Sequence, residues 1–152
     1  MLTTRCLQGA QIIDDAFCGG PDLPQLESSF PLVSRTAANN TAAIILMGNP
    51  RHVAGLPFNV GNATEPGVST RYLLQGGVPS GMRKLPVADP LVQFAARPPN
   101  FKCSLFENRI QAYCDSPDPF CAKGNDPDTH QGYGFEYGKE ALDFIVGKVV
   151  AN

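Results

Sequence analysis

Apolar positions recur with the spacing of one helix side in two parts of this 152-residue chain. Residues 8–18 carry them at positions 10, 12, 13, 16 and 17, which predicts a helix that Gly19 and Gly20 terminate. Residues 139–150 show the clearest amphipathic pattern, with one side made of Ala141, Leu142, Phe144, Ile145 and Val149. A weaker period predicts another helix near residues 33–39.

Two short apolar runs predict strands. Residues 42–47 (AAIILM) stop at a Gly-Asn-Pro turn, a pattern typical of a buried parallel strand with helices on both faces, and residues 109–113 form the second run. We expect loops over residues 19–27, 51–67 and 114–134, which are rich in Gly, Pro, Asn or Asp and have no period. A strand, a loop and a closing helix indicate the end of an α/β fold, where ligands gather at the carboxyl ends of the strands.

Composition excludes several classes of partner. The net charge of −2 gives no electrostatic case for binding nucleic acid or an anionic membrane. No apolar run approaches the roughly 20 residues that span a bilayer, and the first ten residues lack the apolar region of a secretion signal. Five cysteines favour an oxidising compartment, and the odd number leaves at least one of them without an intramolecular partner.

The candidate chemistry centres on two histidines, His52 and His130. Asp118 lies twelve residues before His130, in a segment that Cys114 and Cys121 bound. A carboxylate at this spacing can hold one imidazole nitrogen while the other acts as a general base toward a nucleophile. The spacing alone favours an ordinary surface histidine over a catalytic one. Two distant histidines and this cysteine spacing give no complete ligand set, so we expect no metal site.

Three longer strings change this picture: residues 47–61 (MGNPRHVAGLPFNVG), 113–121 (YCDSPDPFC) and 130–138 (HQGYGFEYG). In this order they resemble the C-terminal signature of the cutinase and acetylxylan esterase family. The resemblance covers nearly all of the chain except residues 1–6 and 68–93. It implies that residues 1–152 are a partial domain, the C-terminal part of a truncated cutinase-like α/β-hydrolase. The implied fold has three α/β/α layers, with a parallel sheet in the middle.

The resemblance also assigns roles to individual residues. It implies that Asp118 is the acid of a catalytic triad and that His130 is its general base. Asp115 matches a residue that is not catalytic in the family, and the role implied for His52 is structural. The backbone N–H of Gln8 matches one donor of the oxyanion hole, and no cofactor is implied.

The cysteines fit the same family. Cys114 and Cys121 match a disulfide that closes the loop carrying the acid, and Cys18 and Cys103 match a pair that ties the first helix to a later loop. A further pair found in acetylxylan esterases is replaced here by Ala63 and Ala122. Cys6 is left over.

The nucleophile of the family is missing. Its Gly-Tyr-Ser-Gln-Gly turn matches residues 5–9, RCLQG, so Leu7 occupies the serine position, and no other Gly-x-Ser-x-Gly occurs. Leucine has no nucleophilic atom, and Cys6 is one residue away, where an elbow turns the side chain away from the base. We therefore expect no catalysis from the literal chain. The alternative to an esterase is a non-catalytic pseudo-esterase or a carbohydrate-binding fragment, and a two-stranded remnant predicts poor folding or aggregation.

Residues 68–93 interrupt a motif that resumes at Phe94. They are a lineage-specific surface loop or the product of a retained intron. The second hypothesis rests on Val68-Ser69, which GTGAGT encodes, and on Gln93, which CAG encodes. Residues 1–7 are an aberrant N-terminus on the same hypothesis.

By resemblance, the substrate is a plant polysaccharide or polyester, acetylated xylan or cutin, attacked through an acyl-enzyme. The residues after His130 are closer to the acetylxylan esterase branch. The resemblance further implies a secreted monomer, with neither nucleic acid nor membrane as a partner. Two glycosylation sequons, at Asn39 and Asn62, are compatible with secretion.

Overall fold

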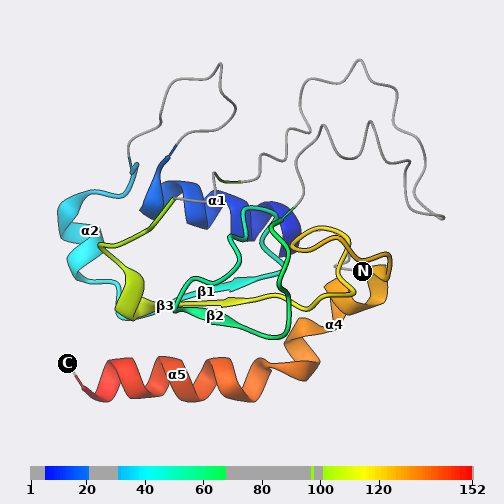
Figure 1. Ribbon diagram of the computed structural model, residues 1–152. Helices are drawn as coiled ribbons and strands as arrows, with labels where there is room; N and C mark the ends of the chain where they lie inside the picture. Colours follow the sequence, from blue (N-terminus) through cyan, green and yellow to red (C-terminus); the bar gives the residue numbers. More distant parts are fainter. Residues whose placement is uncertain (1–5, 21–30, 68–96, 98–100, 152) are drawn as a thin grey trace.

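The computed structural model of the chain describes residues 6–20, 31–67, 97 and 101–151. A parallel sheet lies between helices in this part of the chain, with α1 on one side and α5 on the other (Figure 1). In chain order the elements are α1 (Cys6–Cys18), α2 (Arg35–Asn39), β1 (Ile44–Met47), β2 (Asn59–Val60), the 3-10 helix η1 (Glu107–Arg109), β3 (Ile110–Tyr113), α4 (Pro127–Glu136) and α5 (Gly138–Val150).

The sheet has the strand order β1-β3-β2, and both pairings are parallel. Ile44 pairs with Ile110, and Asn59 pairs with Ala112. The predicted strands at 42–47 and 109–113 are confirmed. The prediction of an uninterrupted loop over residues 51–67 is wrong at β2. Its two residues show no period in the sequence, and they form a strand because they pair with the free edge of β3. Beside this pairing, the N–H of Ala112 donates to the carbonyl of Phe58 at 2.9 Å.

Alternate residues of β1 pack into two cores. Ile44 and Leu46 belong to a cluster with residues of α1 and β3, whereas Ile45 and Met47 pack against a second cluster around Tyr113. A strand whose successive side chains both find apolar neighbours is buried on two faces, as the continuous apolar run predicts. The second cluster also holds Ala122, and Ala63 packs against it.

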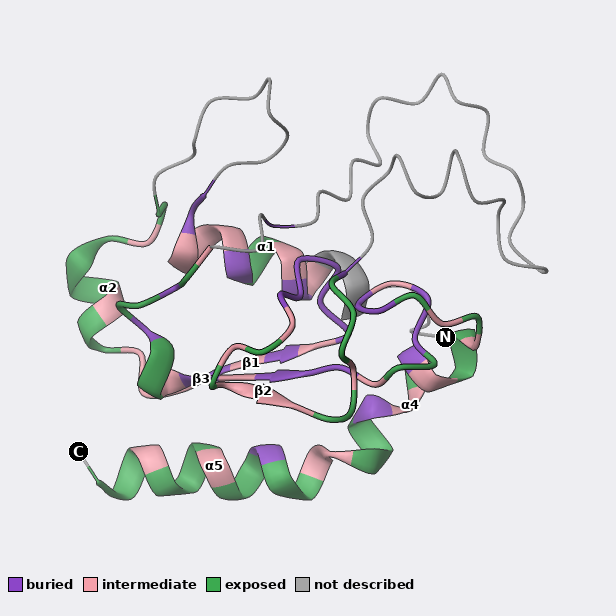
Figure 2. Cartoon of the chain, in the orientation of Figure 1, coloured by how far each residue is buried: buried purple, intermediate pink, exposed green. Residues whose placement is uncertain are grey.

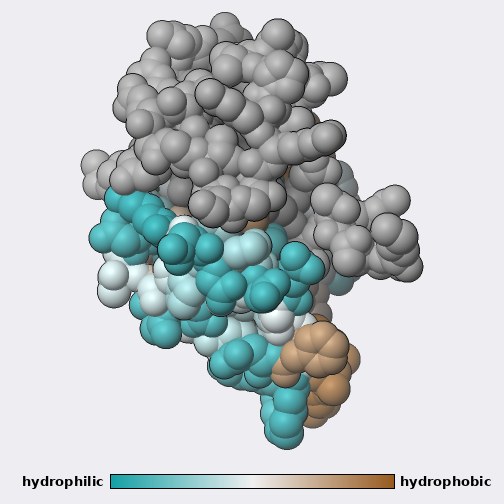
Figure 3. Space-filling view, turned by 90° about the vertical axis from the view of Figure 1, so that its right-hand side faces the viewer, coloured by the Kyte–Doolittle hydropathy of each residue, from teal (hydrophilic) through white to brown (hydrophobic). Residues whose placement is uncertain are grey.

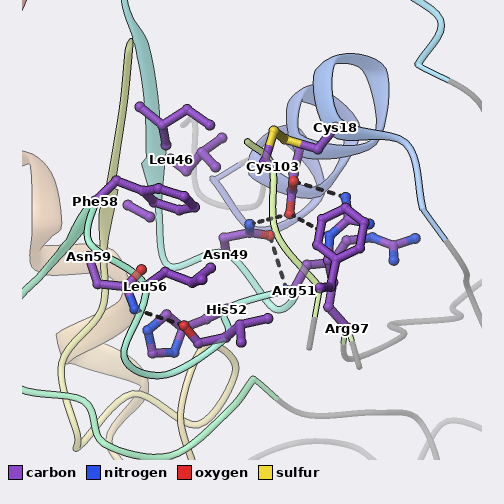
Figure 4. Close-up of a pocket in the computed structure, with 15 residues that line it drawn as sticks. Cys18, Leu46, Asn49, Arg51, His52, Leu56, Phe58, Asn59, Arg97 and Cys103 are labelled. Carbon is purple, nitrogen blue, oxygen red and sulfur yellow. Dashed lines mark hydrogen bonds and ion pairs between the residues drawn. A yellow bond between two sulfur atoms is a disulfide. The ribbon is translucent and has the colours of Figure 1, made fainter. Parts of the chain in front are cut away.

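Charged side chains attach α1 to the loop after β1 (Figure 4). The guanidinium of Arg97 donates to both carboxylate oxygens of Asp14, at 2.9 and 3.3 Å, and the amide of Asn49 donates to the same carboxylate at 2.8 Å. Arg51 forms an ion pair with Asp15 at 2.6 Å. These groups are mostly buried, and several hydrogen bonds offset the cost of removing their charges from water. The ion pairs therefore fix α1 in one place over the sheet.

Two disulfides have the pairing that the family resemblance implies. Cys18 at the end of α1 is bonded to Cys103, and Cys114 after β3 is bonded to Cys121. The hypotheses about residues 68–93 and about the first five residues concern segments outside the described residues. The side chain of Cys6 also lies outside them.

The helix predicted at 8–18 is confirmed as α1, and α2 confirms the one near 33–39. The predicted loop over residues 114–134 is wrong from Pro127 onward, where α4 begins. Asp126 caps that helix, accepting a hydrogen bond from the N–H of Asp128 at 3.1 Å, and Pro127 stands at its first position. Gly132 and Gly134 interrupt the apolar period and conceal α4 in the sequence.

The predicted helix at 139–150 is confirmed as α5, although its apolar side is mostly in contact with solvent (Figures 2 and 3). Ala141 is buried, whereas Leu142 and Val149 are 57% and 58% exposed. In Figure 3 the apolar side chains gather at the lower end of the molecule, where α5 lies in Figure 1. The described sheet has only three short strands, too little surface to cover this helix.

Candidate active site

The candidate site lies at the carboxyl ends of β1 and β3. Gly48 follows β1, and the segment from Cys114 to Cys121 follows β3 and carries Asp118. His130 stands on α4, so the structure places it on a helix and not in a loop. The disulfide between Cys114 and Cys121 closes the acid-bearing segment into a tight loop, which restricts the positions open to the carboxylate.

Asp118 is completely buried, and its side-chain oxygens accept every hydrogen bond that they form, as a carboxylate does. Its Oδ1 accepts from the backbone N–H groups of Phe120 at 2.7 Å and Cys121 at 3.2 Å. Its Oδ2 accepts from Nδ1 of His130 at 2.8 Å and from the hydroxyl of Tyr133 at 2.9 Å. Four donors around one buried carboxylate offset the cost of removing its charge from water.

His130 is 7% exposed, and its two ring nitrogens have different surroundings. Nδ1 faces the acceptor-only carboxylate of Asp118, which assigns the proton of the neutral ring to Nδ1. Nε2 is buried without a hydrogen-bond partner among the described residues, so its lone pair is available. The ring of Phe120 packs edge-on against the imidazole, with centroids 4.7 Å apart. A neutral imidazole with its proton on Nδ1 and its lone pair on Nε2 is the tautomer that a general base needs.

Tyr133 is a site residue that the sequence reasoning missed. It follows His130 by three residues on α4, so both side chains lie on one side of the helix. Its hydroxyl donates to Asp118 and accepts from the backbone N–H of Asp115 at 2.9 Å. Burial raises the pKa of Tyr133, which keeps the hydroxyl protonated as a donor. The spacing of three residues between His130 and Tyr133 could have indicated this role. It could be used only if residues 127–136 had been predicted to form a helix.

Gly48 provides the space for the base. Its φ of +61° lies in the left-handed region, and a Cβ at this position would collide with the His130 ring, 2.6 Å from Nδ1. The glycine therefore allows the backbone after β1 to approach the imidazole closely.

Asp115 forms no hydrogen bond with His130 among the described residues and connects other elements. Its carboxylate accepts from the hydroxyl of Tyr137 at 3.0 Å and from the backbone N–H of Asn62 at 3.1 Å. Burial, followed by the hydrogen bond to Asp115, raises the pKa of Tyr137 to about 12. Asp115 thus links the turn after β2 to the start of α5.

His52 is also connected to backbone groups. Its Nδ1–H lies 3.1 Å from the carbonyl oxygens of both Glu65 and Cys121, which are acceptors only. Burial lowers the pKa of His52 below its ordinary value of 6.5, although the two carbonyls and the charge of Asp118 act in the opposite direction. The neutral ring joins the segment after β2 to the end of the acid-bearing loop.

Leu7 and Gln8 lie in the first turn of α1. Backbone N–H groups in a first helical turn have no acceptor within the helix, which suits the oxyanion role implied for Gln8. Figure 1 places the beginning of α1 at the same end of the sheet as α4.

A small cavity among the described residues lies away from this pair. It measures about 20 Å³, between α1 and the loop after β1, and its walls include Asp14, Asn49 and Arg97 (Figure 4). That volume holds about one water molecule. Neither Asp118 nor His130 lines it or the wider groove of about 200 Å³ between β2 and Phe144.

The described residues form neither a metal-binding cluster nor a helix that could span a membrane. No three His, Cys, Asp or Glu side chains converge there as a metal site would require. None of the described helices is both long and apolar enough to cross a membrane.

Comparison with known proteins identifies the family of this chain. The family model described as Cutinase matches residues 7–149. An acetylxylan esterase of Hypocrea jecorina is 41% identical over 140 residues, 91% of this chain and 37% of that protein. Cutinase 11 of Verticillium dahliae is 42% identical over 144 residues, 93% of this chain and 39% of that protein.

Solved structures that resemble this chain are also acetylxylan esterases. The catalytic core domain of acetyl xylan esterase from Trichoderma reesei superposes with a TM-score of 0.71 at 39% identity, covering 93% of this chain and 56% of that one. An acetylxylan esterase solved at 0.90 Å resolution gives a TM-score of 0.71 at 35% identity with the same coverage. The chain therefore spans about half of each solved relative and less of the two full-length proteins.

Proposed function

This chain belongs to the cutinase family, and from that premise we propose that Asp118 and His130 are the acid and the base of a serine ester hydrolase. The observation that carries the proposal is the buried hydrogen bond of 2.8 Å between Asp118 and Nδ1 of His130, with Nε2 left available. In such a pair the acid fixes the tautomer and stabilises the imidazolium that forms when the base accepts a proton.

The reaction of the family has two steps. A serine attacks the ester carbonyl while the base takes its proton, and the base returns that proton to the leaving alcohol. Water, deprotonated by the same base, then hydrolyses the acyl-enzyme. His130 is the base in both steps, and the N–H of Gln8 donates to the oxyanion of each tetrahedral intermediate.

Leu7 occupies the position of that serine. A hydrocarbon side chain cannot form the acyl-enzyme, so the literal chain is a non-catalytic member of the family. Acetylated xylan or cutin is the substrate class of the esterase to which the acid and base belong. The two disulfides support an extracellular location.

A chimera tests the proposed pair. The N-terminal part of the Hypocrea jecorina acetylxylan esterase, through its own nucleophile, is joined to this chain at Gln8, and residues 68–93 are removed. The product should hydrolyse p-nitrophenyl acetate and release acetate from acetylated xylan. His130→Ala and Asp118→Asn should each lower kcat by about 10³-fold or more.

Asp128→Asn is the matched control, because this exposed carboxylate lies on the same helix as His130. It should leave kcat within about twofold. A folded, active chimera whose kcat survives His130→Ala would refute the assignment. Turnover by the literal chain that His130→Ala abolishes would refute its non-catalytic status. Sequencing the transcript before Gln8 and across residues 67–94 then shows whether a serine-bearing product is made.

A further inference from the structure

The turn after β2 presents a sequon whose structural setting differs from that of the other one in the chain. Asn62 and Thr64 are exposed, and Ala63 between them is half-buried against the second core cluster. Gly61 precedes them with a φ of +101°. The turn therefore presents the Asn and Thr side chains outward on a fixed backbone.

The amide of Asn62 is held by its oxygen. Oδ1 accepts a hydrogen bond of 2.7 Å from the backbone N–H of Ser116, and the N–H of Asn62 donates to Asp115 at 3.1 Å. No hydrogen bond in the described part of the chain uses Nδ2. The nitrogen that glycosylation modifies is thus free at the surface, and a sugar on it leaves the acceptor oxygen in place.

The other sequon lacks these properties. Asn39 is the last residue of α2, in helical backbone, and the hydroxyl of Thr41 donates to the carbonyl of Ala37 at 2.9 Å. The sequon threonine is therefore engaged within the helix end. Surface loops are the usual setting of modified sequons.

We propose that Asn62 carries an N-linked oligosaccharide. The two disulfides point to the oxidising secretory route, on which the modification takes place. In the transfer, Nδ2 forms a bond to C1 of an oligosaccharide carried on a lipid pyrophosphate. The bond from C1 to the pyrophosphate oxygen breaks, the lipid pyrophosphate leaves, and Nδ2 loses one proton. This modification does not depend on ester hydrolysis.

The placement gives the sugar a definite neighbourhood. Asn62 contacts Asp115 and Ser116, which begin the loop that Cys114 and Cys121 close around Asp118. The oligosaccharide would extend into solvent beside that loop and leave Asp118, which is completely buried, untouched.

The full chain, preceded by a cleavable secretion leader from a secreted protein, is translated in vitro with microsomes, so that neither folding nor export is required. Leader cleavage reports entry into the lumen. We expect a slower-migrating form that endoglycosidase removes, and enzymatic deglycosylation should convert Asn62 to Asp in the tryptic peptide. Thr64→Ala should abolish both signals, since it removes the sequon and keeps the Asn62 side chain.

Thr41→Ala is the control at the other sequon, and it should leave the Asn62 signal unchanged. Leader cleavage without modification of Asn62 would overturn the proposal. So would a slower form that persists in Thr64→Ala and is lost in Thr41→Ala.

Discussion

The hydroxyl of Tyr133 lies 2.9 Å from Oδ2 of Asp118, the same oxygen that His130 contacts. Tyr133 thus restrains the carboxylate that orients His130, and both side chains belong to α4. Because the hydroxyl also accepts from the N–H of Asp115, removing it takes one donor from the Asp118 carboxylate and leaves the Asp115 N–H without its acceptor.

Tyr133→Phe should lower the free energy of unfolding by about 1–3 kcal/mol, the cost of leaving a buried polar group unsatisfied. Urea denaturation measures it. Tyr137→Phe is the control, since that hydroxyl contacts Asp115 at a half-buried position and its loss should cost about 0.5–1.5 kcal/mol. Equal costs for the two variants would contradict the special role of Tyr133.

Gly48→Ala should displace His130. The substitution combines an unfavourable φ, about 1–2 kcal/mol, with a collision worth about 1–3 kcal/mol. Gly55 provides the matched control, because its φ is +79° and a Cβ there meets nothing within 4 Å. Gly55→Ala should therefore incur only the first cost. Proton NMR should show the His130 ring N–H resonance shifted or lost in Gly48→Ala and retained in Gly55→Ala.

Removal of the two disulfides should have unequal effects. The loops span 85 residues for Cys18–Cys103 and 7 for Cys114–Cys121. Chain entropy alone then predicts losses of roughly 4.6 and 2.4 kcal/mol for the paired alanine variants. Urea midpoints under oxidising conditions measure both. The reverse order would show that strain or local contacts outweigh loop closure.

His52 should make the fold sensitive to acid. Its pKa in the folded state is below 6.5, so below pH 6.5 the unfolded chain binds a proton that the folded chain excludes. Stability should fall as the pH decreases from 6.5 toward the folded-state value, by at most about 1.4 kcal/mol per unit, and should be unaffected by His52 above that window. The test compares wild type with His52→Gln by urea denaturation at pH 7.5 and 5.5. An identical pH dependence would contradict the assignment.

The exposed side of α5 should promote self-association. Val146 is 51% exposed, so Val146→Lys should change the unfolding free energy by about 0.5 kcal/mol or less and reduce light scattering at high concentration. Ala141→Lys, at a buried position on the same helix, should destabilise by more than about 2 kcal/mol. Scattering that Val146→Lys leaves unchanged would exclude this surface as the cause.

The sequence predicted those elements that carry a period or a long apolar run. β1, β3, α1 and α5 were predictable because burial on a face repeats along several residues. β2 has two residues, too few to show a period, and exists because β3 offers it backbone partners. α4 was concealed by its glycines, although Asp126 and Pro127 are helix-start signals.

In the candidate site too, some residues could be predicted from the sequence and others could not. Family motifs identified Asp118 and His130, and the structure brings them into contact. Tyr133 and Gly48 were missed because their roles depend on three-dimensional proximity. Tyr133 reaches the carboxylate from the next turn of α4, and Gly48 lies against the imidazole from the turn after β1. The exposure of the apolar side of α5 could not be predicted either. An apolar stripe along a helix predicts that another surface covers it, and the sequence does not show whether that surface is present.

The bond between Cys18 and Cys103 has a practical consequence for anyone who handles this protein. A protease that cuts the backbone once anywhere between these residues leaves two pieces joined through sulfur. Such a nicked molecule migrates as intact protein on a gel run without reductant and separates into two bands only after thiol treatment. The buried ion pair between Asp14 and Arg97 also connects the two pieces when the cut falls between them.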